Sequence, residues 1–133
     1  MAKEVPELEI NPEIVCQIVD RAHEFHAQDE VDFEEEPEGP ADMTAVETLS
    51  EYAEEPTYLE IKSAIDDLEP DQQVALVALM WLGRGDFSVE EWDDALSQAK
   101  DAWTAHTADY LIATPLVADY LEEGLSQLGH SCD

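Results

Sequence analysis

The feature that most constrains this chain is a run of nine apolar residues from Val74 to Leu82. The run is too short to span a bilayer, which takes about 20 residues, and a helix that is apolar on nearly all sides has to be buried. Pro70 and Asp71 precede the run as a helix start, and Gly83 follows it as a candidate C-terminal cap. The sequence therefore predicts one buried central helix with the other elements packed around it.

The other apolar stripes recur at helical spacing, and no segment alternates with a period of two. Each stripe follows a start signal: Asn11, Asp42, Thr57-x-x-Glu60, Ser88-x-x-Glu91 and Thr114-Pro115. The last predicted helix ends at Gly129. We therefore predict an all-α fold, a compact bundle of five or six helices that forms a single domain over residues 1–133.

The segment from Gln28 to Asp42 differs from the rest of the chain. It is dense in carboxylates, and Pro37, Gly39 and Pro40 interrupt it. Like charges broken by proline and glycine favour a loop over a helix. We expect residues 28–42 to form an acidic loop that contributes little to the core.

The balance of charge restricts the partners of this chain. It has 34 acidic and 5 basic residues, for a net charge of −29. Such a surface repels phosphate backbones and anionic lipid headgroups, so we expect neither a nucleic acid nor a membrane as partner, whereas a basic protein fits. The alternative is that the acidity only keeps the protein soluble at high salt. Clustering of the carboxylates on one face would favour a partner, and an even spread would favour solubility.

The cysteine pattern bears on location. Cys16 and Cys132 lie near opposite ends of the chain. Two such cysteines are typical of a reducing compartment rather than of a disulfide framework. Because the N-terminal residues also lack a basic region followed by an apolar run, we expect a cytoplasmic protein.

A glycine-containing string joins two of the predicted helices. The residues from Gly85 to Glu91 resemble the second half of an EF-hand calcium loop. The positions of three essential oxygen ligands are, however, held by Met80, Leu82 and Arg84. We therefore predict an EF-hand-like helix–loop–helix that lacks calcium ligands. Its structural turn consists of Gly83, Arg84, Gly85 and Asp86, with the two glycines permitting positive φ.

Two histidines are candidate metal ligands. His23 and His26 share a face of the first predicted helix, with Cys16 or Glu24 as further candidates. A structural zinc site needs four ligands and a catalytic one needs three plus water, so we expect no metal here. The chain has no nucleophile elbow, P-loop, dinucleotide fingerprint or zinc-protease motif. We therefore predict no cofactor and assign no catalytic residue.

Three stretches of the chain resemble the bacterial domain-of-unknown-function family 3775. They are Pro56-Thr57-Tyr58, the residues from Ala75 to Gly85, and those from Thr114 to Gly124. The resemblance runs from about Pro56 to Leu125, and the string Trp-Leu-Gly-Arg-Gly is its most specific part. It implies a small helical bacterial protein with a family core at residues 56–125. Since the family is uncharacterised, the resemblance implies no activity.

Three hypotheses of function stay open. The favoured one is a small, acidic, non-enzymatic protein-interaction module, similar to an adaptor. The second is a small enzyme or metal-dependent protein that uses histidines and carboxylates, and the third is a surface that serves only solubility. For the first hypothesis, the candidate partner-binding residues are Asp93, Asp94, Glu122 and Glu123.

Overall fold

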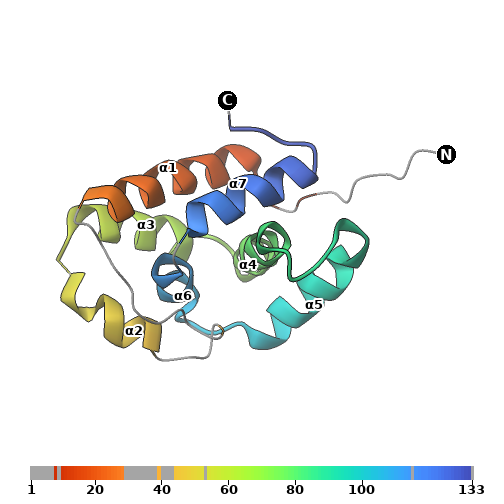
Figure 1. Cartoon of the computed structure of the whole chain (residues 1–133). Helices are drawn as coiled ribbons and strands as arrows, with labels where there is room; N and C mark the ends of the chain where they lie inside the picture. Colours follow the sequence, from red (N-terminus) through yellow and green to blue (C-terminus); the bar gives the residue numbers. More distant parts are fainter. Residues whose placement is uncertain are drawn as a thin grey trace.

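The structure is a computed structural model that describes residues 8, 10–28, 39, 44–52, 54–114 and 116–132. Every regular element within these residues is helical, which confirms the all-α prediction (Figure 1). In chain order, the elements are α1 (Pro12–Gln28), α2 (Thr44–Leu49), η1 (Ser50–Tyr52), α3 (Pro56–Asp66), α4 (Pro70–Arg84), η2 (Val89–Glu91), α5 (Trp92–Ala102), α6 (Thr107–Ala113) and α7 (Val117–Gln127). Two of the α-helices among the described residues are short: α2 has six residues and α6 has seven. A membrane crossing needs a longer apolar helix than any that these residues form.

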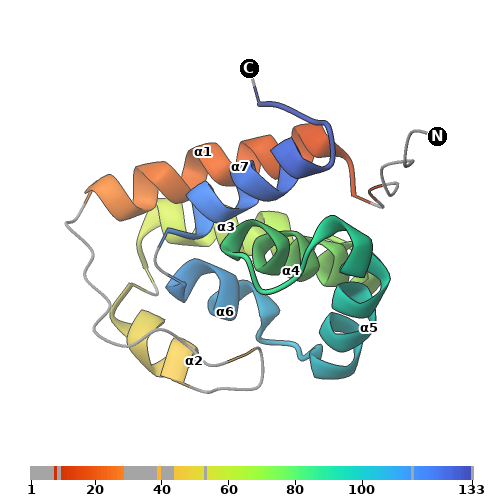
Figure 2. The same cartoon turned by 45° about the vertical axis from the view of Figure 1, so that its right-hand side comes forward.

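The central helix is α4, as the apolar run predicts. Its side chains from Val74 to Leu82 are buried except for the half-buried Trp81. Complete burial of one large aliphatic side chain contributes about 1.5–3 kcal/mol, so this segment holds much of the core. Both α5 and α7 pack against α4, while α1 lies alongside α7 and α3 (Figures 1 and 2).

A pair of glycines allows α4 and α7 to cross with their backbones nearly in contact. A Cβ atom added at Gly83 would lie 1.7 Å from the carbonyl oxygen of Tyr120. One added at Gly124 would lie 2.4 Å from the carbonyl oxygen of Leu79. Because α4 continues to Arg84 and ends at Gly85, Gly83 lies inside the helix, and the prediction that it caps the helix is wrong. It is glycine because α7 leaves no space for a side chain.

Gly85 is the residue that ends α4. It has a φ of +94°, and its N–H donates to the carbonyl oxygens of Trp81 and Leu82. Gly129, with a φ of +85°, follows α7 as predicted. The left-handed region costs most other residues roughly 1–2 kcal/mol, which explains glycine at both positions. A turn thus connects α4 to α5, and the three elements form a helix–turn–helix. The likeness of this unit to an EF-hand stays a prediction.

Two predicted start signals form as expected. The side-chain oxygen of Asn11 accepts a hydrogen bond of 2.9 Å from the N–H of Glu13 at the start of α1. The N–H of Ser88 donates to a carboxylate oxygen of Glu91, also over 2.9 Å, before α5. Both contacts span two or three residues, so the local sequence is enough to predict them.

Two other start signals are wrong. Thr57 is buried within α3, which begins one residue earlier at Pro56 because proline suits the first helical position. Thr114 does not cap α7; it is fully buried, and its hydroxyl donates to the carbonyl oxygen of Tyr110. That bond closes α6, a short helix whose seven residues are all buried. The sequence did not predict α6, because a helix buried on every side has no amphipathic stripe.

The acidic loop predicted at residues 28–42 lies outside the described residues, apart from Gln28, which ends α1, and Gly39.

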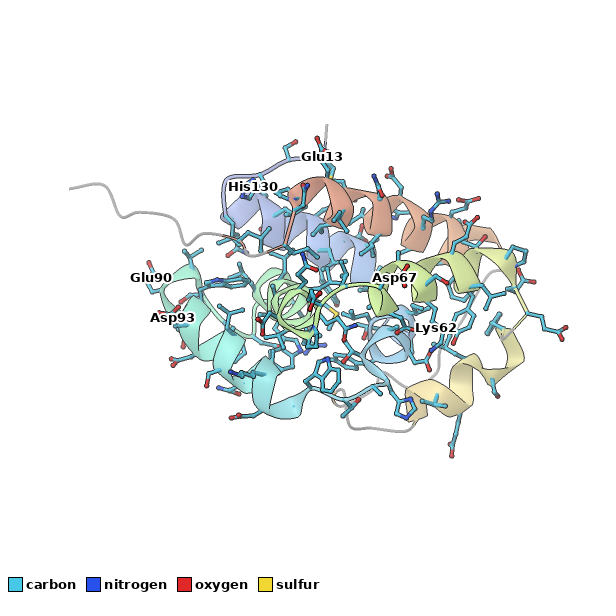
Figure 3. The ribbon with its side chains drawn as sticks, turned by 180° about the vertical axis from the view of Figure 1, so that it is seen from behind. Glu13, Lys62, Asp67, Glu90, Asp93 and His130 are labelled. Atoms are coloured by element: carbon cyan, nitrogen blue, oxygen red, sulfur yellow. A yellow bond between two sulfur atoms is a disulfide. The ribbon has the colours of Figure 1, made fainter. Side chains whose placement is uncertain are left out.

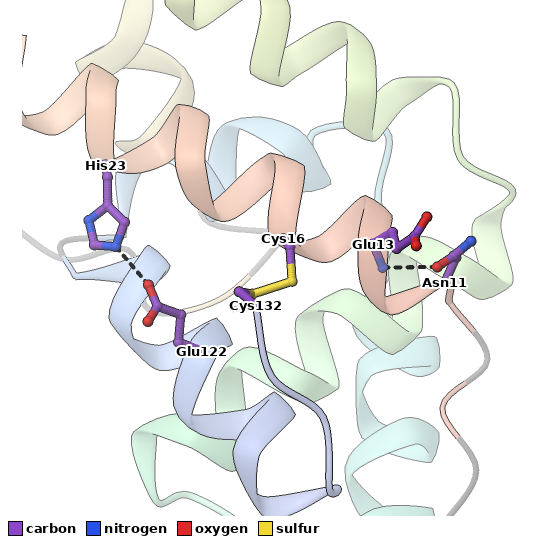
Figure 4. Close-up of a disulfide and its surroundings, with 6 residues drawn as sticks. All are labelled: Asn11, Glu13, Cys16, His23, Glu122 and Cys132. Carbon is purple, nitrogen blue, oxygen red and sulfur yellow. Dashed lines mark hydrogen bonds and ion pairs between the residues drawn. A yellow bond between two sulfur atoms is a disulfide. The ribbon is translucent and has the colours of Figure 1, made fainter.

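A disulfide joins Cys16 in α1 to Cys132 in the segment after α7 (Figure 4). The two residues are 116 positions apart in the sequence, yet their Cα atoms are 5.4 Å apart. The prediction that these cysteines form no disulfide is therefore wrong. Their separation in the sequence conceals that α1 and α7 lie side by side, which returns the chain after Gly129 to the second turn of α1.

Candidate functional site

Nearly all the described carboxylates lie at the surface. Asp109 is the buried exception among the side chains that the structure describes. The others come from several helices and turns, as Glu13, Asp67 and Asp93 illustrate in Figure 3. The described acidity is thus spread over the surface rather than confined to one face, as the solubility hypothesis expects. A binding site has to be defined by local geometry instead.

The four predicted partner-binding residues are all exposed, but they lie on two different helices. Asp93 and Asp94 are in the first turn of α5, whereas Glu122 and Glu123 are in α7. Both helices pack against α4. Glu122 is also engaged already, since its Oε1 lies 2.8 Å from Nε2 of His23.

Asp93 and Asp94 differ in having no hydrogen bond or ion pair within the described part of the chain. Negative charges in the first turn of a helix interact favourably with its dipole, which accounts for part of their presence. No side chain among the described residues offsets their two charges.

A pocket of about 350 Å³ lies between the end of α4, the turn that follows it, α5 and Gly39. Trp81 and Phe87 form one wall, with stacked rings whose centroids are 5.9 Å apart. Gln98 and Ala102 line it from α5. Asp94 precedes Gln98 by four residues, and Gln98 precedes Ala102 by four, so all three share one helix face. Asp94 thus lies one helical turn before the pocket-lining Gln98 on the same face of α5.

The predicted structural turn supplies a second wall of this pocket. Arg84 binds Asp86 through two nitrogens, at 2.6 and 2.8 Å. Burial alone would lower the pKa of Arg84, but its hydrogen bond to Asp86 helps to raise that pKa above the usual value. The Asp86 carboxylate thereby offsets the charge of Arg84 at this wall of the pocket. On the other wall, the indole N–H of Trp81 donates a hydrogen bond of 2.8 Å to the hydroxyl of Tyr110, which fixes the indole ring.

A buried group of ionisable residues joins α3 to α6. The hydroxyl of Tyr58 donates to Asp109 over 2.5 Å, and the ammonium group of Lys62 lies 3.6 Å from the same carboxylate. Burial and then this hydrogen bond raise the pKa of Tyr58 far above its usual value. A phenol so resistant to ionisation is a poor base or nucleophile. None of these residues lines the aromatic pocket or the small apolar cavity that Ile18, His26 and Leu121 help to form, so the group fastens two helices together.

The two candidate metal-binding histidines have separate surroundings. His23 is exposed and faces carboxylates of α7, whereas Nε2 of His26 lies 3.2 Å from the carbonyl oxygen of Ile112. Burial lowers the pKa of His26. Cys16 is bonded to Cys132, so a site built from both histidines and this thiol does not form. Beside His23 the structure places Asp119 and Glu122, neither of which the sequence analysis named as a candidate metal ligand.

One protein family matches this chain. Its description is "Protein of unknown function (DUF3775)", and the match covers residues 58–130, more than half of the chain. The matched region contains the aromatic pocket wall, Arg84 and the glycines of the α4–α7 crossing. No curated protein and no solved structure matches the chain.

Proposed function

The chain belongs to the DUF3775 family, whose description assigns no activity, and we propose that it is a non-enzymatic protein-interaction module for a basic partner. The proposed contact surface, named the α5 rim, consists of Asp93, Asp94 and the pocket wall of Trp81 and Phe87. The observation that supports the proposal is an aromatic pocket whose α5 side includes Gln98, one helical turn after Asp94, a carboxylate with no side-chain partner among the described residues.

The chemistry of the α5 rim favours an arginine or lysine side chain on the partner. Aromatic faces attract cations, and the apolar stem of such a side chain can pack along a ring while its charged head meets a carboxylate. The net charge of −29 adds long-range attraction for any basic protein. The same charge repels phosphate backbones and anionic headgroups, so we propose neither a nucleic acid nor an anionic membrane as partner.

The enzyme hypothesis has less support. A catalytic acid or base needs a perturbed pKa inside a cleft that admits a substrate. Tyr58 has the perturbed pKa but lines neither the aromatic pocket nor the small apolar cavity beside His26.

The test measures binding of the protein to an array of short peptides rich in arginine and lysine. The variant Asp93→Asn/Asp94→Asn removes two charges from the α5 rim. The control Asp20→Asn/Glu24→Gln removes two exposed charges from α1, which packs against α3 and α7 rather than α5. Binding is compared in about 0.1 M and about 1 M NaCl, where the Debye length is about 10 and 3 Å.

A module that uses the α5 rim loses several-fold in affinity in the first variant and little in the control. Phe87→Ala should weaken the same peptides, because it removes one aromatic wall of the pocket. If both charge variants weaken every peptide equally, and Phe87→Ala has no effect, the attraction is generic and the solubility hypothesis is correct.

The cytoplasmic location also becomes a matter for experiment. Disulfides persist in oxidising compartments and are rare in the cytosol, so the bond between Cys16 and Cys132 weighs against that expectation. Alkylation of the protein directly in cells, followed by mass measurement, determines whether the two cysteines are bonded where the protein works.

A further inference from the structure

A cluster of three metal-ligating side chains lies across the contact between α1 and α7. Its members are His23 from α1, and Asp119 and Glu122 from α7. Figure 4 shows His23 and Glu122 pointing toward each other from the two helices. The cluster shares no residue with the α5 rim, so the inference drawn from it is independent of the proposed function.

The spacing of the three side chains suits one metal ion. Nε2 of His23 lies 2.8 Å from Oε1 of Glu122 and 3.8 Å from Oδ1 of Asp119, and all three ligand atoms lie within 4.8 Å of one another. A zinc ion about 2.0–2.2 Å from nitrogen and oxygen ligands holds those ligands roughly 3–3.6 Å apart. The two measured distances bracket this range, so small rotations of exposed side chains are enough to close the site.

The helices fix the three positions in advance. Asp119 and Glu122 are three residues apart in α7 and therefore occupy one face of it. His23 follows Cys16 by seven residues, or about two helical turns, so the histidine and the disulfide lie on one side of α1. Helix packing and the disulfide to the segment after α7 thus both hold α1, and with it His23, beside Asp119 and Glu122 of α7. Little backbone ordering is required when an ion binds.

The ligand set also indicates which ion fits. Imidazole favours zinc, copper and nickel over magnesium and calcium, while the two carboxylates offset the charge of a divalent cation. We propose that His23, Asp119 and Glu122 bind a divalent transition-metal ion of the zinc type, with water completing its coordination. The ion bridges α1 and α7, and the net charge of −29 raises the local concentration of cations around it.

The test titrates the oxidised protein with ZnCl₂ in a calorimeter, without reductant, so that Cys16 and Cys132 stay bonded and offer no thiolate. About 0.5 M NaCl suppresses diffuse attraction of cations to the acidic surface. The site variants are His23→Ala and Asp119→Asn. The control is Glu123→Gln, which removes one negative charge from the same helix without touching the cluster. Every altered side chain is exposed, and circular dichroism establishes that each variant is folded.

We expect one saturable zinc event per chain, and at least tenfold weaker binding in both site variants. Loss of a direct ligand should cost at least as much as loss of an outer-shell partner, which weakens metal binding about 10–100-fold. Glu123→Gln should bind as the wild type does, and magnesium in the place of zinc should give no saturable event. Absence of a 1:1 event, or an affinity that His23→Ala leaves unchanged, overturns the proposal. So does an equal loss in Glu123→Gln, because that result shows binding to the general negative field.

Discussion

Replacing Gly83 with alanine tests the close crossing of α4 and α7. The added Cβ would lie 1.7 Å from the carbonyl oxygen of Tyr120, whereas real Cβ atoms essentially never approach within 3.0 Å, so the helices must separate locally by about 1.3 Å. Overpacking of a filled core costs about 1–3 kcal/mol and sometimes more. Alanine returns about 1 kcal/mol through its higher helix propensity. The obstacle is backbone, which cannot rotate away, so we expect a cost at the upper end of this range and a net loss of about 2 kcal/mol.

The assay is urea unfolding followed by circular dichroism, with Gly85→Ala as the comparison. A Cβ at Gly85 meets nothing within 4 Å, so that variant bears only the cost of its left-handed backbone, about 1–2 kcal/mol. Gly83→Ala should lower the midpoint at least as far, although its backbone conformation is helical. If Gly83→Ala is as stable as the wild type or more stable, the glycine is an ordinary helical position and the close crossing is wrong.

Three further perturbations test other parts of the fold. Cys132→Ser opens a loop of more than 100 residues and should cost up to about 4.7 kcal/mol in the chain-entropy description, and reduction of the wild type should lower the urea midpoint equally. Tyr58→Phe removes a hydrogen bond to the buried Asp109 and should cost about 1.5–3 kcal/mol; an unchanged midpoint would refute the fastening of α3 to α6. Burial lowers the pKa of His26 in the folded protein below 6.5, the value in the unfolded chain. As the pH drops through 6.5, the unfolded chain therefore binds the proton first, and the free energy of unfolding decreases. The free energy of unfolding of His26→Gln, measured from pH 8 to 5, should therefore lack that part of the decline.

The sequence by itself determined the features that depend on neighbouring residues. Helical spacing and the apolar run of α4 predicted an all-α protein with that helix at its centre. The caps at Asn11 and Ser88 and the glycine after α7 were also predicted correctly. In each case, the contacts involved span at most a few positions, so the residue types and their spacing specify them. The exposure of Asp93 and Asp94 followed in the same way from their place beside a buried stripe.

Tertiary structure decided the rest, because the partners lie far apart in the chain. The sequence alone predicts that Gly83 is a helix cap, and only the structure shows that the backbone of α7 lies against it. The sequence alone predicts two separate thiols at Cys16 and Cys132, and only the packing of α1 beside α7 brings them within bonding distance. The same packing gives His23 its two carboxylates, 96 and 99 positions further along the chain. Only the crossing of helices brings such residues together, and the crossing depends on which side chains, or missing side chains, the two surfaces present to each other.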